Sequence, residues 1–257
     1  CLAVGDRQRV QQIEQRAERD FGLTSQVLME HAGRSIAEVV RERVGGSVAG
    51  REVLVLAGPG HNGGDGRVMG RVLAGWGARV TVFSWKERAL ESAGQRVVVS
   101  EDRSELRAAI ATAEVVADAL LGTGHARPLD ATMGAALALV AAERARRPSL
   151  LVVTIDLPSG LNADSGAVDA GAIAADLTVT LACPKVGLLL FPGAALIGEL
   201  RVGDIGLPPA MALRSSLELI DDALVRGLLP PRPLESNKGT YGKVLVVAGS
   251  SLYVGAA

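Results

Sequence analysis

The sequence has few cysteines, no block rich in lysine or arginine, and no long apolar run. Only two of its 257 residues are cysteine, Cys1 and Cys183, too few for a disulfide framework or a cysteine-based metal site. No apolar run reaches the ~18 residues that a membrane-spanning helix needs. The formal net charge is −1, without a basic patch for nucleic acid. We therefore expect a cytoplasmic protein that binds neither membranes nor nucleic acid.

What the sequence does contain is an alternation of apolar strands and helices. Hydrophobic residues make up 48% of the chain and charged residues 21%, enough to bury a core. Two amphipathic helices are expected first, at residues 7–20 and 25–43, the second capped by Ser25. Strands are expected at residues 52–57, 79–84, 115–120, 151–155, 177–182 and 199–202. Further helices are expected at residues 66–76, 104–112 and 133–146. Near-continuous apolar strands separated by helices predict an α/β fold, a Rossmann-like three-layer sandwich with a mostly parallel central sheet.

Residues 58–66, GPGHNGGDG, directly follow the first long strand. Glycines there let the backbone approach a ligand closely, and the start of the next helix offers unpaired N–H groups to oxygen-rich groups. Gly58, Gly60 and Gly63 satisfy the dinucleotide pattern G-x-G-x-x-G, which is weak evidence by itself. Asp65 would repel a pyrophosphate at the helix start, and Ser84-Trp85 stands where a ribose-binding acid is expected. A hydride-transferring dehydrogenase is therefore the disfavoured interpretation.

Two further polar segments follow later strands. In the first, residues 118–128, Asp118 lies inside an apolar strand, where a buried carboxyl needs a cation or several hydrogen-bond donors. In the second, residues 156–166, Asp156 ends a strand and is followed by Ser159, which lacks the surroundings of a nucleophile. A buried carboxyl at such a position suits proton transfer. Because parallel strands end at one edge of the sheet, we expect the three segments to form one site.

These three segments together resemble the NAD(P)H-hydrate epimerase family, as do LMEHAGR at residues 28–34, KVGLL at 185–189 and DIGLP at 204–208. The resemblance covers most of residues 7–210. It implies an epimerase that interconverts the R and S hydrates of NADH and NADPH, called NADHX and NADPHX, with Asp156 as general acid/base. It also implies a potassium ion held by Asn62, Asp118 and Ser159 with backbone carbonyls, and a homodimer or higher homo-oligomer formed through the N-terminal helices. The residues that it implies for substrate binding are His61, Asn62, Gly63, Gly64, Asp65, Gly122, Thr123, Gly124, His125, Ala126, Arg127, Pro128 and Asp156.

The resemblance divides the chain into an epimerase domain at residues 1–210 and a second segment at 211–257. The second segment contains prolines and then an expected strand at residues 243–248. It resembles the opening of a ribokinase-like, ADP-dependent dehydratase domain, so ADP is expected only for the dehydratase part that is missing here. One alternative from another functional class stays open. Some relatives of the domain are non-catalytic binding or scaffold modules, although converging carboxyl groups favour an enzyme.

Overall fold

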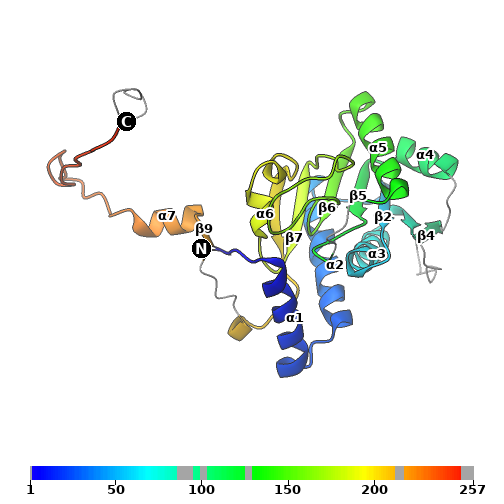
Figure 1. The fold of residues 1–257 in the computed structure, drawn as a ribbon, viewed down its shortest axis with the longest axis horizontal. Coiled ribbons are helices and arrows are strands. Elements are labelled where there is room, and N and C mark those ends of the chain that lie inside the picture. Colours follow the sequence, from blue (N-terminus) through cyan, green and yellow to red (C-terminus); the bar gives the residue numbers. More distant parts are fainter. Residues whose placement is uncertain (1, 86–94, 99–102, 125–128, 212–216, 250–257) are drawn as a thin grey trace. The chain divides into compact units, whose positions relative to one another are not determined.

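The computed structural model describes residues 2–85, 95–98, 103–124, 129–211 and 217–249. Helices and strands alternate along most of this length (Figure 1). In chain order the elements are β1 (Leu2–Ala3), α1 (Arg7–Phe21), α2 (Ser25–Arg43), β2 (Glu52–Ala57), α3 (His61–Gly75), β3 (Arg79–Ser84), β4 (Gln95–Val98), α4 (Arg103–Thr112), β5 (Val115–Ala119), α5 (Ala131–Arg146), β6 (Leu151–Ile155), β7 (Leu177–Leu181), α6 (Val186–Leu189), β8 (Glu199–Gly203), β9 (Glu218–Leu219) and α7 (Asp222–Leu228), with 3-10 turns at Gly193–Ala195 and Pro209–Met211.

The main sheet contains seven described strands in the order β4-β3-β2-β5-β6-β7-β8. Every neighbouring pair is parallel. The chain starts in the middle at β2, moves outward to β4, and then returns to β5 on the other side of β2. The strand order therefore reverses between β2 and β5, and ligands of open α/β sheets bind at this reversal, outside the carboxyl ends of the strands.

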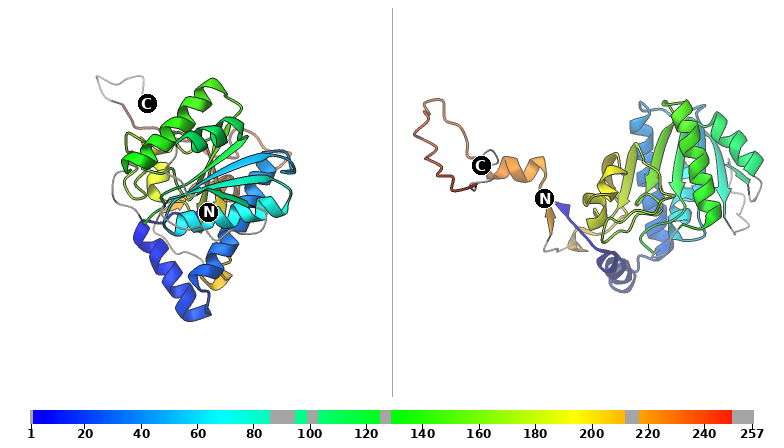
Figure 2. Two further views of the ribbon diagram at one scale, coloured as in Figure 1. Left: turned by 90° about the vertical axis from the view of Figure 1, so that its right-hand side faces the viewer. Right: turned by 45° about the horizontal axis from the view of Figure 1, so that its top comes forward.

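Helices cover both faces of this sheet and bury its strands. Helices α2 and α3 pack on one face around a cluster that includes Ile36, Met69 and Val55. Helices α4 and α5 pack on the other around Ile110, Leu137 and neighbouring strand residues. The left view in Figure 2 shows the sheet between these two helical layers. The predicted α/β three-layer, Rossmann-like sandwich is confirmed. The apolar strands predicted this fold because strands that are covered on both faces are apolar throughout.

The predicted element positions hold with corrections at the ends. Helix α3 begins at His61 rather than residue 66, so most of the glycine-rich segment is helical rather than loop. Thr24, not Ser25, caps α2, since its hydroxyl oxygen accepts a hydrogen bond from the N–H of Val27 at 3.4 Å. The sequence did not predict the edge strand β4, the β1–β9 pair or α6. None of the described helices combines the length and apolar character that crossing a bilayer requires.

The chain divides into two compact units, residues 2–219 and a second unit that includes residues 220–249. The second unit contains α7, capped by Asp221, followed by turns and extended chain. The strand expected at residues 243–248 is wrong for this structure, because that segment has no regular secondary structure. A strand requires a hydrogen-bonded neighbour, and no described segment pairs with this one. Its apolar side chains are exposed, Val244 and Val247 at 89% each.

Candidate functional site

Three chain segments meet at the carboxyl edge of the sheet, beside the reversal between β2 and β5. They are the start of α3 after β2, the loop after β5, and the loop after β6. Glycines allow the start of α3 and the loop after β5 to lie very close to each other. A Cβ on Gly58 would overlap the carbonyl of Leu120, and one on Gly63 would overlap the carbonyl of Gly58. A Cβ on Gly122 would lie 3.2 Å from the side chain of Asn62. The glycines therefore serve close packing of backbone on backbone at this edge.

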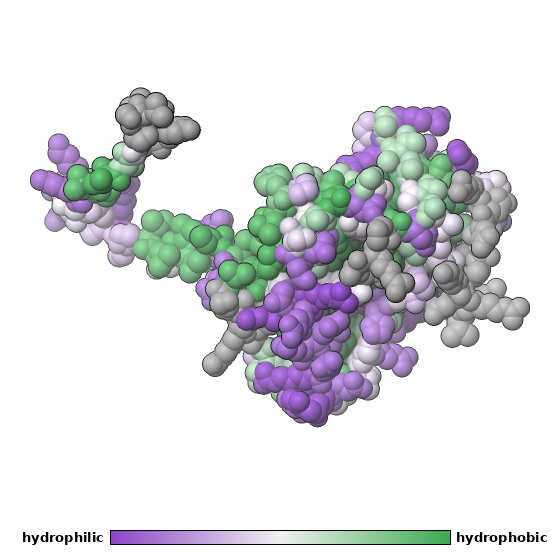
Figure 3. All heavy atoms as spheres, in the orientation of Figure 1, coloured by the Kyte–Doolittle hydropathy of each residue, from purple (hydrophilic) through white to green (hydrophobic). Residues whose placement is uncertain are grey.

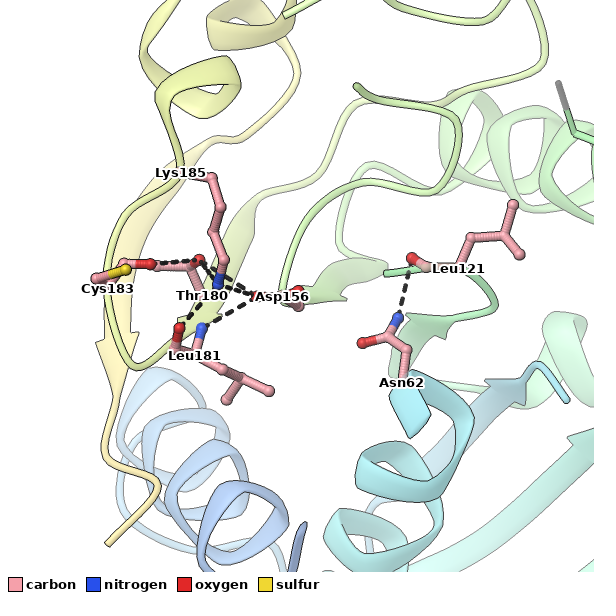
Figure 4. Close-up of polar contacts among 7 residues, drawn as sticks. All are labelled: Asn62, Leu121, Asp156, Thr180, Leu181, Cys183 and Lys185. Carbon is pink, nitrogen blue, oxygen red and sulfur yellow. Dashed lines mark hydrogen bonds and ion pairs between the residues drawn. The ribbon is translucent and has the colours of Figure 1, made fainter. Parts of the chain in front are cut away.

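A continuous hydrogen-bond network joins Asn62, Ser159 and Asp118 through the backbone of Leu121. The amide Nδ2 of Asn62 donates to the carbonyl of Leu121 at 3.0 Å (Figure 4). The N–H of Leu121 donates to Oγ of Ser159 at 3.0 Å, and that hydroxyl donates to Oδ1 of Asp118 at 2.6 Å. The expectation that these three side chains gather at one place is therefore met by the geometry.

Asp118 is held by hydrogen-bond donors, and no cationic side chain of the described residues pairs with it. Its Oδ2 accepts the N–H of Ser159 at 2.9 Å, and its Oδ1 also accepts the N–H of Leu120 at 3.2 Å. Burial raises the pKa of Asp118, and the hydrogen bonds from Ser159 and Leu120 act in the opposite direction. The carboxyl thus fixes the loop after β6 to the end of β5, from a position behind the cavity wall.

Asn62 supplies the observation that bears on a bound cation. Its Oδ1 is buried and has no hydrogen-bond partner among the described residues, although its Nδ2 is paired. A buried amide oxygen without a partner is costly, and a cation would satisfy it. Figure 4 shows this oxygen directed away from Leu121, toward the side where Asp156 and Lys185 lie. A neutral amide oxygen of this kind is a ligand that suits a weakly charged cation such as potassium, whereas the oxygens of Asp118 and Ser159 are already engaged in the hydrogen-bond network behind it.

Asp156 occupies an unusual backbone conformation at the end of β6. Its φ is +69°, in the left-handed region that non-glycine residues rarely adopt. Oδ1 of its buried carboxyl accepts the N–H of Leu181 at 3.2 Å and forms an ion pair with Nζ of Lys185 (Figure 4). Lys185 is fully buried, and Nζ also donates to Oγ1 of Thr180 at 3.0 Å and to the carbonyl of Leu181 at 2.8 Å.

A cavity of about 490 Å³ opens in front of these groups. Of the residues predicted to bind substrate, His61, Asn62, Asp65, Gly122, Thr123, Gly124 and Asp156 line it. Gly63 and Gly64 do not line it; they pack against Gly58 and Met29 instead. His125, Ala126, Arg127 and Pro128 lie outside the described residues. The predicted potassium ligands divide in the same way: Asn62 is in the cavity wall, whereas Asp118 and Ser159 lie behind it.

The sequence did not identify two contributors to this cavity. One is Lys185, which belongs to the KVGLL motif but to which the sequence alone assigned no role. A lysine within an apolar segment was the sequence feature that could have indicated a buried functional residue. The other is helix α1, whose Gln11, Glu14 and Glu18 line the cavity. Figure 3 shows the outer surface of α1 as strongly hydrophilic. The periodicity of α1 predicts a helix but carries no information on what that helix covers.

Acidic groups dominate the electrostatics of the cavity. Burial raises the pKa of Asp65 well above its usual value, and the nearby carboxyls of Asp156 and Glu14 add to the effect. The side-chain carboxyl of Asp65 forms no hydrogen bond or ion pair with another described residue, so it lacks a compensating partner. Partial withdrawal from water likewise raises the pKa of Glu14, with His61 and Lys185 acting against it. The cavity therefore contains two carboxyls in different surroundings: Asp156, paired with a lysine, and Asp65, whose pKa burial raises.

The sequence profile of the family described as YjeF-related protein N-terminus matches residues 25–187, more than half of the chain. The chain belongs to this family. Curated relatives agree with the match: the bifunctional NAD(P)H-hydrate repair enzyme Nnr of Thermofilum pendens is 38% identical over 95% of this chain and 47% of its own length. The enzyme of the same name from Moorella thermoacetica is 38% identical over 95% of this chain and 48% of its own length. The resemblance read from the three loops is thus confirmed.

The chain spans about half the length of the curated relatives that it matches. A solved structure supports the fold: the yeast protein ynu0 superposes with a TM-score of 0.68 at 23% identity, covering 91% of this chain and 97% of its own. The family match begins at residue 25 and therefore leaves out α1. Glu14 and its neighbours on α1 thus contribute to the cavity from outside the matched segment.

Proposed function

We propose that the chain is an NAD(P)H-hydrate epimerase domain, which interconverts the R and S forms of NADHX and NADPHX for metabolite repair. The observation that carries the proposal is the carboxyl of Asp156, fixed in the wall of a cavity at the strand-order reversal. The names of the curated relatives support the same substrates. A non-catalytic scaffold has no need for a carboxyl that faces a cavity from a strained backbone position, so the enzyme is favoured over that alternative.

Inversion at ring carbon 6 requires a bond at that carbon to break and re-form: either the C6–O bond, with the protonated hydroxyl leaving as water and water adding to the other face, or the C6–N bond, with the hydroxyl proton removed as the ring opens and returned as it closes. That carbon bears a hydroxyl group and the ring nitrogen, so its configuration inverts only through a planar or ring-opened intermediate. Asp156 is the general acid/base in this step, through the carboxyl oxygen Oδ2 that no described residue occupies. Such a group contributes about 10²- to 10⁴-fold to a rate. Asp65, whose buried carboxyl lines the same cavity, contacts the same ring.

The rest of the cavity binds the substrate. His61, Asn62, Asp65 and Gly122 to Gly124 contact the hydrated ring and the phosphates, while Gly63 and Gly64 allow the close packing that forms this wall. The proposal extends the substrate contacts to His125, Ala126, Arg127 and Pro128, which follow Gly124 in the chain. Potassium would be held by Oδ1 of Asn62 in the cavity wall, with Asp118, Ser159 and backbone carbonyls as its further proposed ligands. When bound, the ion supplies positive charge that balances anionic groups of the substrate. ADP belongs to the dehydratase part of the longer relatives and not to this cavity.

Conversion of purified R hydrate to S, followed by chromatography, tests the activity. The wild-type chain should accelerate it in potassium buffer. Asp156→Ala should lower kcat by about 10²- to 10⁴-fold while substrate still binds, and Asp222→Ala, at an exposed position of α7, should match the wild type. Substrate binding without any acceleration by the wild-type chain would favour the scaffold alternative. Normal turnover by Asp156→Ala would show that another group moves the proton.

Potassium has a test that does not depend on turnover. A cation that binds only the folded chain raises its stability by RT ln(1 + [L]/Kd), about 2.7 kcal/mol at a hundredfold excess over Kd. The thermal midpoint should therefore rise more in KCl than in NaCl at equal ionic strength. Asn62→Leu should abolish this difference because it removes the buried Oδ1. Equal midpoints of the wild type in both salts would remove potassium from the proposal.

The larger organisation is part of the same proposal. Residues 1–210 form the epimerase domain, and residues 211–257 form a linker and the beginning of a ribokinase-like dehydratase domain, in a cytoplasmic homodimer or higher homo-oligomer. In the longer relatives, dehydration of the S hydrate would consume what the epimerase supplies. Light scattering at micromolar concentration should give the mass of a dimer or larger assembly, and a monomer would contradict this part.

A further inference from the structure

Lys185 is the most completely buried charged side chain in the described part of the chain. It follows β7 and directly precedes α6, with an exposed fraction of 0%. All three ammonium hydrogens have acceptors, namely Oδ1 of Asp156, Oγ1 of Thr180 and the carbonyl of Leu181. Removing a charge from water costs several kcal/mol, so a buried lysine persists only when its partners compensate it completely.

The backbone around Lys185 is held as firmly as its ammonium group. The N–H of Gly5 donates to the carbonyl of Pro184 at 2.9 Å, and the N–H of Val186 donates to the carbonyl of Gly5 at 3.1 Å. A Cβ on Gly187 would overlap the carbonyl of Asn162. The N-terminal segment and the loop after β6 therefore fix the base of the lysine side chain. Its ammonium group has little freedom to follow a moving partner.

The two oxygens of the Asp156 carboxyl have different surroundings. Oδ1 receives the Lys185 ammonium and the N–H of Leu181, with the Thr180 hydroxyl further away at 3.5 Å. Oδ2 accepts no hydrogen bond from the described residues, and Asp156 lines the cavity. One oxygen is thus tied to the protein, and the other is available to a ligand. The left-handed backbone of Asp156 needs such support, because it costs roughly 1–2 kcal/mol for a non-glycine residue.

We infer that Lys185 is a positioning residue that holds Oδ1 of Asp156 so that Oδ2 faces the reacting carbon of the hydrated ring. The inference rests on the proposed function and adds to it a residue that acts through Asp156. Displacement of a catalytic group by about 1 Å can cost 10²-fold in rate. Loss of Lys185 should therefore lower kcat far more than it raises KM. A purely structural lysine would instead lower the amount of folded protein and leave kcat per folded molecule unchanged.

Chemical rescue separates these roles. Lys185→Ala removes three methylene groups and the ammonium group from a site that lines the cavity, so propylammonium can enter from solution. We expect kcat per folded molecule to fall about 10²-fold, with KM within about threefold of the wild type. Propylammonium should restore at least about tenfold of the lost kcat, and propan-1-ol, of similar size but uncharged, should not. Lys238→Ala removes an exposed lysine and should equal the wild type.

A second variant and a structure cover the other outcomes. Thr180→Val is the variant to use if Lys185→Ala does not fold. It removes the hydroxyl oxygen that accepts a hydrogen bond from Nζ of Lys185 and should lower kcat about tenfold. Propan-1-ol should not restore the activity of this variant. A crystal structure of the folded lysine variant should show the Asp156 carboxyl turned away from its original direction. An unchanged kcat, equal rescue by propan-1-ol, or an unmoved Asp156 carboxyl would overturn the inference. An inactive wild type would refute the proposed function. The crystal structure of the lysine variant would then test by itself whether Lys185 holds the Asp156 carboxyl in place.

Discussion

Ser159→Ala is expected to destabilise the fold because Ser159 connects two loops at the edge of the sheet. The side chain is fully buried. Its hydroxyl donates to Oδ1 of Asp118 at 2.6 Å and accepts the N–H of Leu121 at 3.0 Å. The substitution deletes one oxygen and changes the local volume little. It therefore tests the hydrogen bonds themselves, with little contribution from packing.

The magnitude follows from the two groups that lose their partner. The N–H of Leu121 becomes a buried donor without an acceptor, which costs about 1–3 kcal/mol. Asp118 loses its shortest hydrogen bond but keeps those from the N–H groups of Leu120 and Ser159, so its loss lies near the net ~1 kcal/mol of a typical bond. The free energy of unfolding should fall by about 2–4 kcal/mol.

Urea unfolding followed by circular dichroism measures this difference. The midpoint should move to lower urea at an unchanged slope, because the surface exposed on unfolding stays the same. Ser165→Ala is the matched control: Ser165 is exposed, and its hydroxyl accepts only a 3.3 Å hydrogen bond from the N–H of Ala167. It should change stability by less than about 0.5 kcal/mol. Equal effects of the two variants would refute the assigned role of the Ser159 network.

Two further predictions concern the start of α3. Gly63→Ala should lower the free energy of unfolding by about 1–3 kcal/mol or more, because its Cβ would overlap the carbonyl of Gly58. The control Gly60→Ala, which has open space around its Cβ, should change the free energy of unfolding by less than about 0.5 kcal/mol. Equal urea midpoints of the two variants would contradict the packing assigned to Gly63. Asp65 has a pKa raised above the ordinary 3.8, so the wild type loses stability as the pH rises through and above that value, where the unfolded chain ionises first. The difference in thermal midpoint between Asp65→Asn and the wild type should therefore grow as the pH rises above 3.8. Glu38→Gln, at an exposed surface pair, should track the wild type. A difference for Asp65→Asn that does not change with pH would show that folding does not raise the pKa of Asp65.

The sequence predicts the sheet well because its strands are buried on both faces. Residues 52–57 and 151–155 are apolar almost without interruption, and their ends coincide with β2 and β6. The start of α3 was harder to predict, since the glycines at its N-terminus normally indicate a loop. Glycines occupy these helical positions because a Cβ on Gly63 would overlap the carbonyl of Gly58, and a Cβ on Gly66 would overlap the side chain of Ala119. Tertiary packing there outweighs helix propensity.

The site was predictable where strand ends alone determine position. Asn62 and Ser159 follow β2 and β6, and Asp118 lies near the end of β5 between them, so the parallel order brings the three together. Lys185 was not predictable in this way, because its contact with Asp156 depends on the path of the chain after β7. The contribution of α1 to the cavity likewise depends on how that helix packs, which no periodicity encodes.

The central claim is most directly tested by the rate at which purified R hydrate approaches its equilibrium with S. In potassium buffer the wild-type chain should accelerate this approach in proportion to its concentration, and Asp156→Asn, which keeps the size of the side chain, should remove about 10²- to 10⁴-fold of that acceleration. An approach at the spontaneous rate with the folded wild-type chain present would contradict the account.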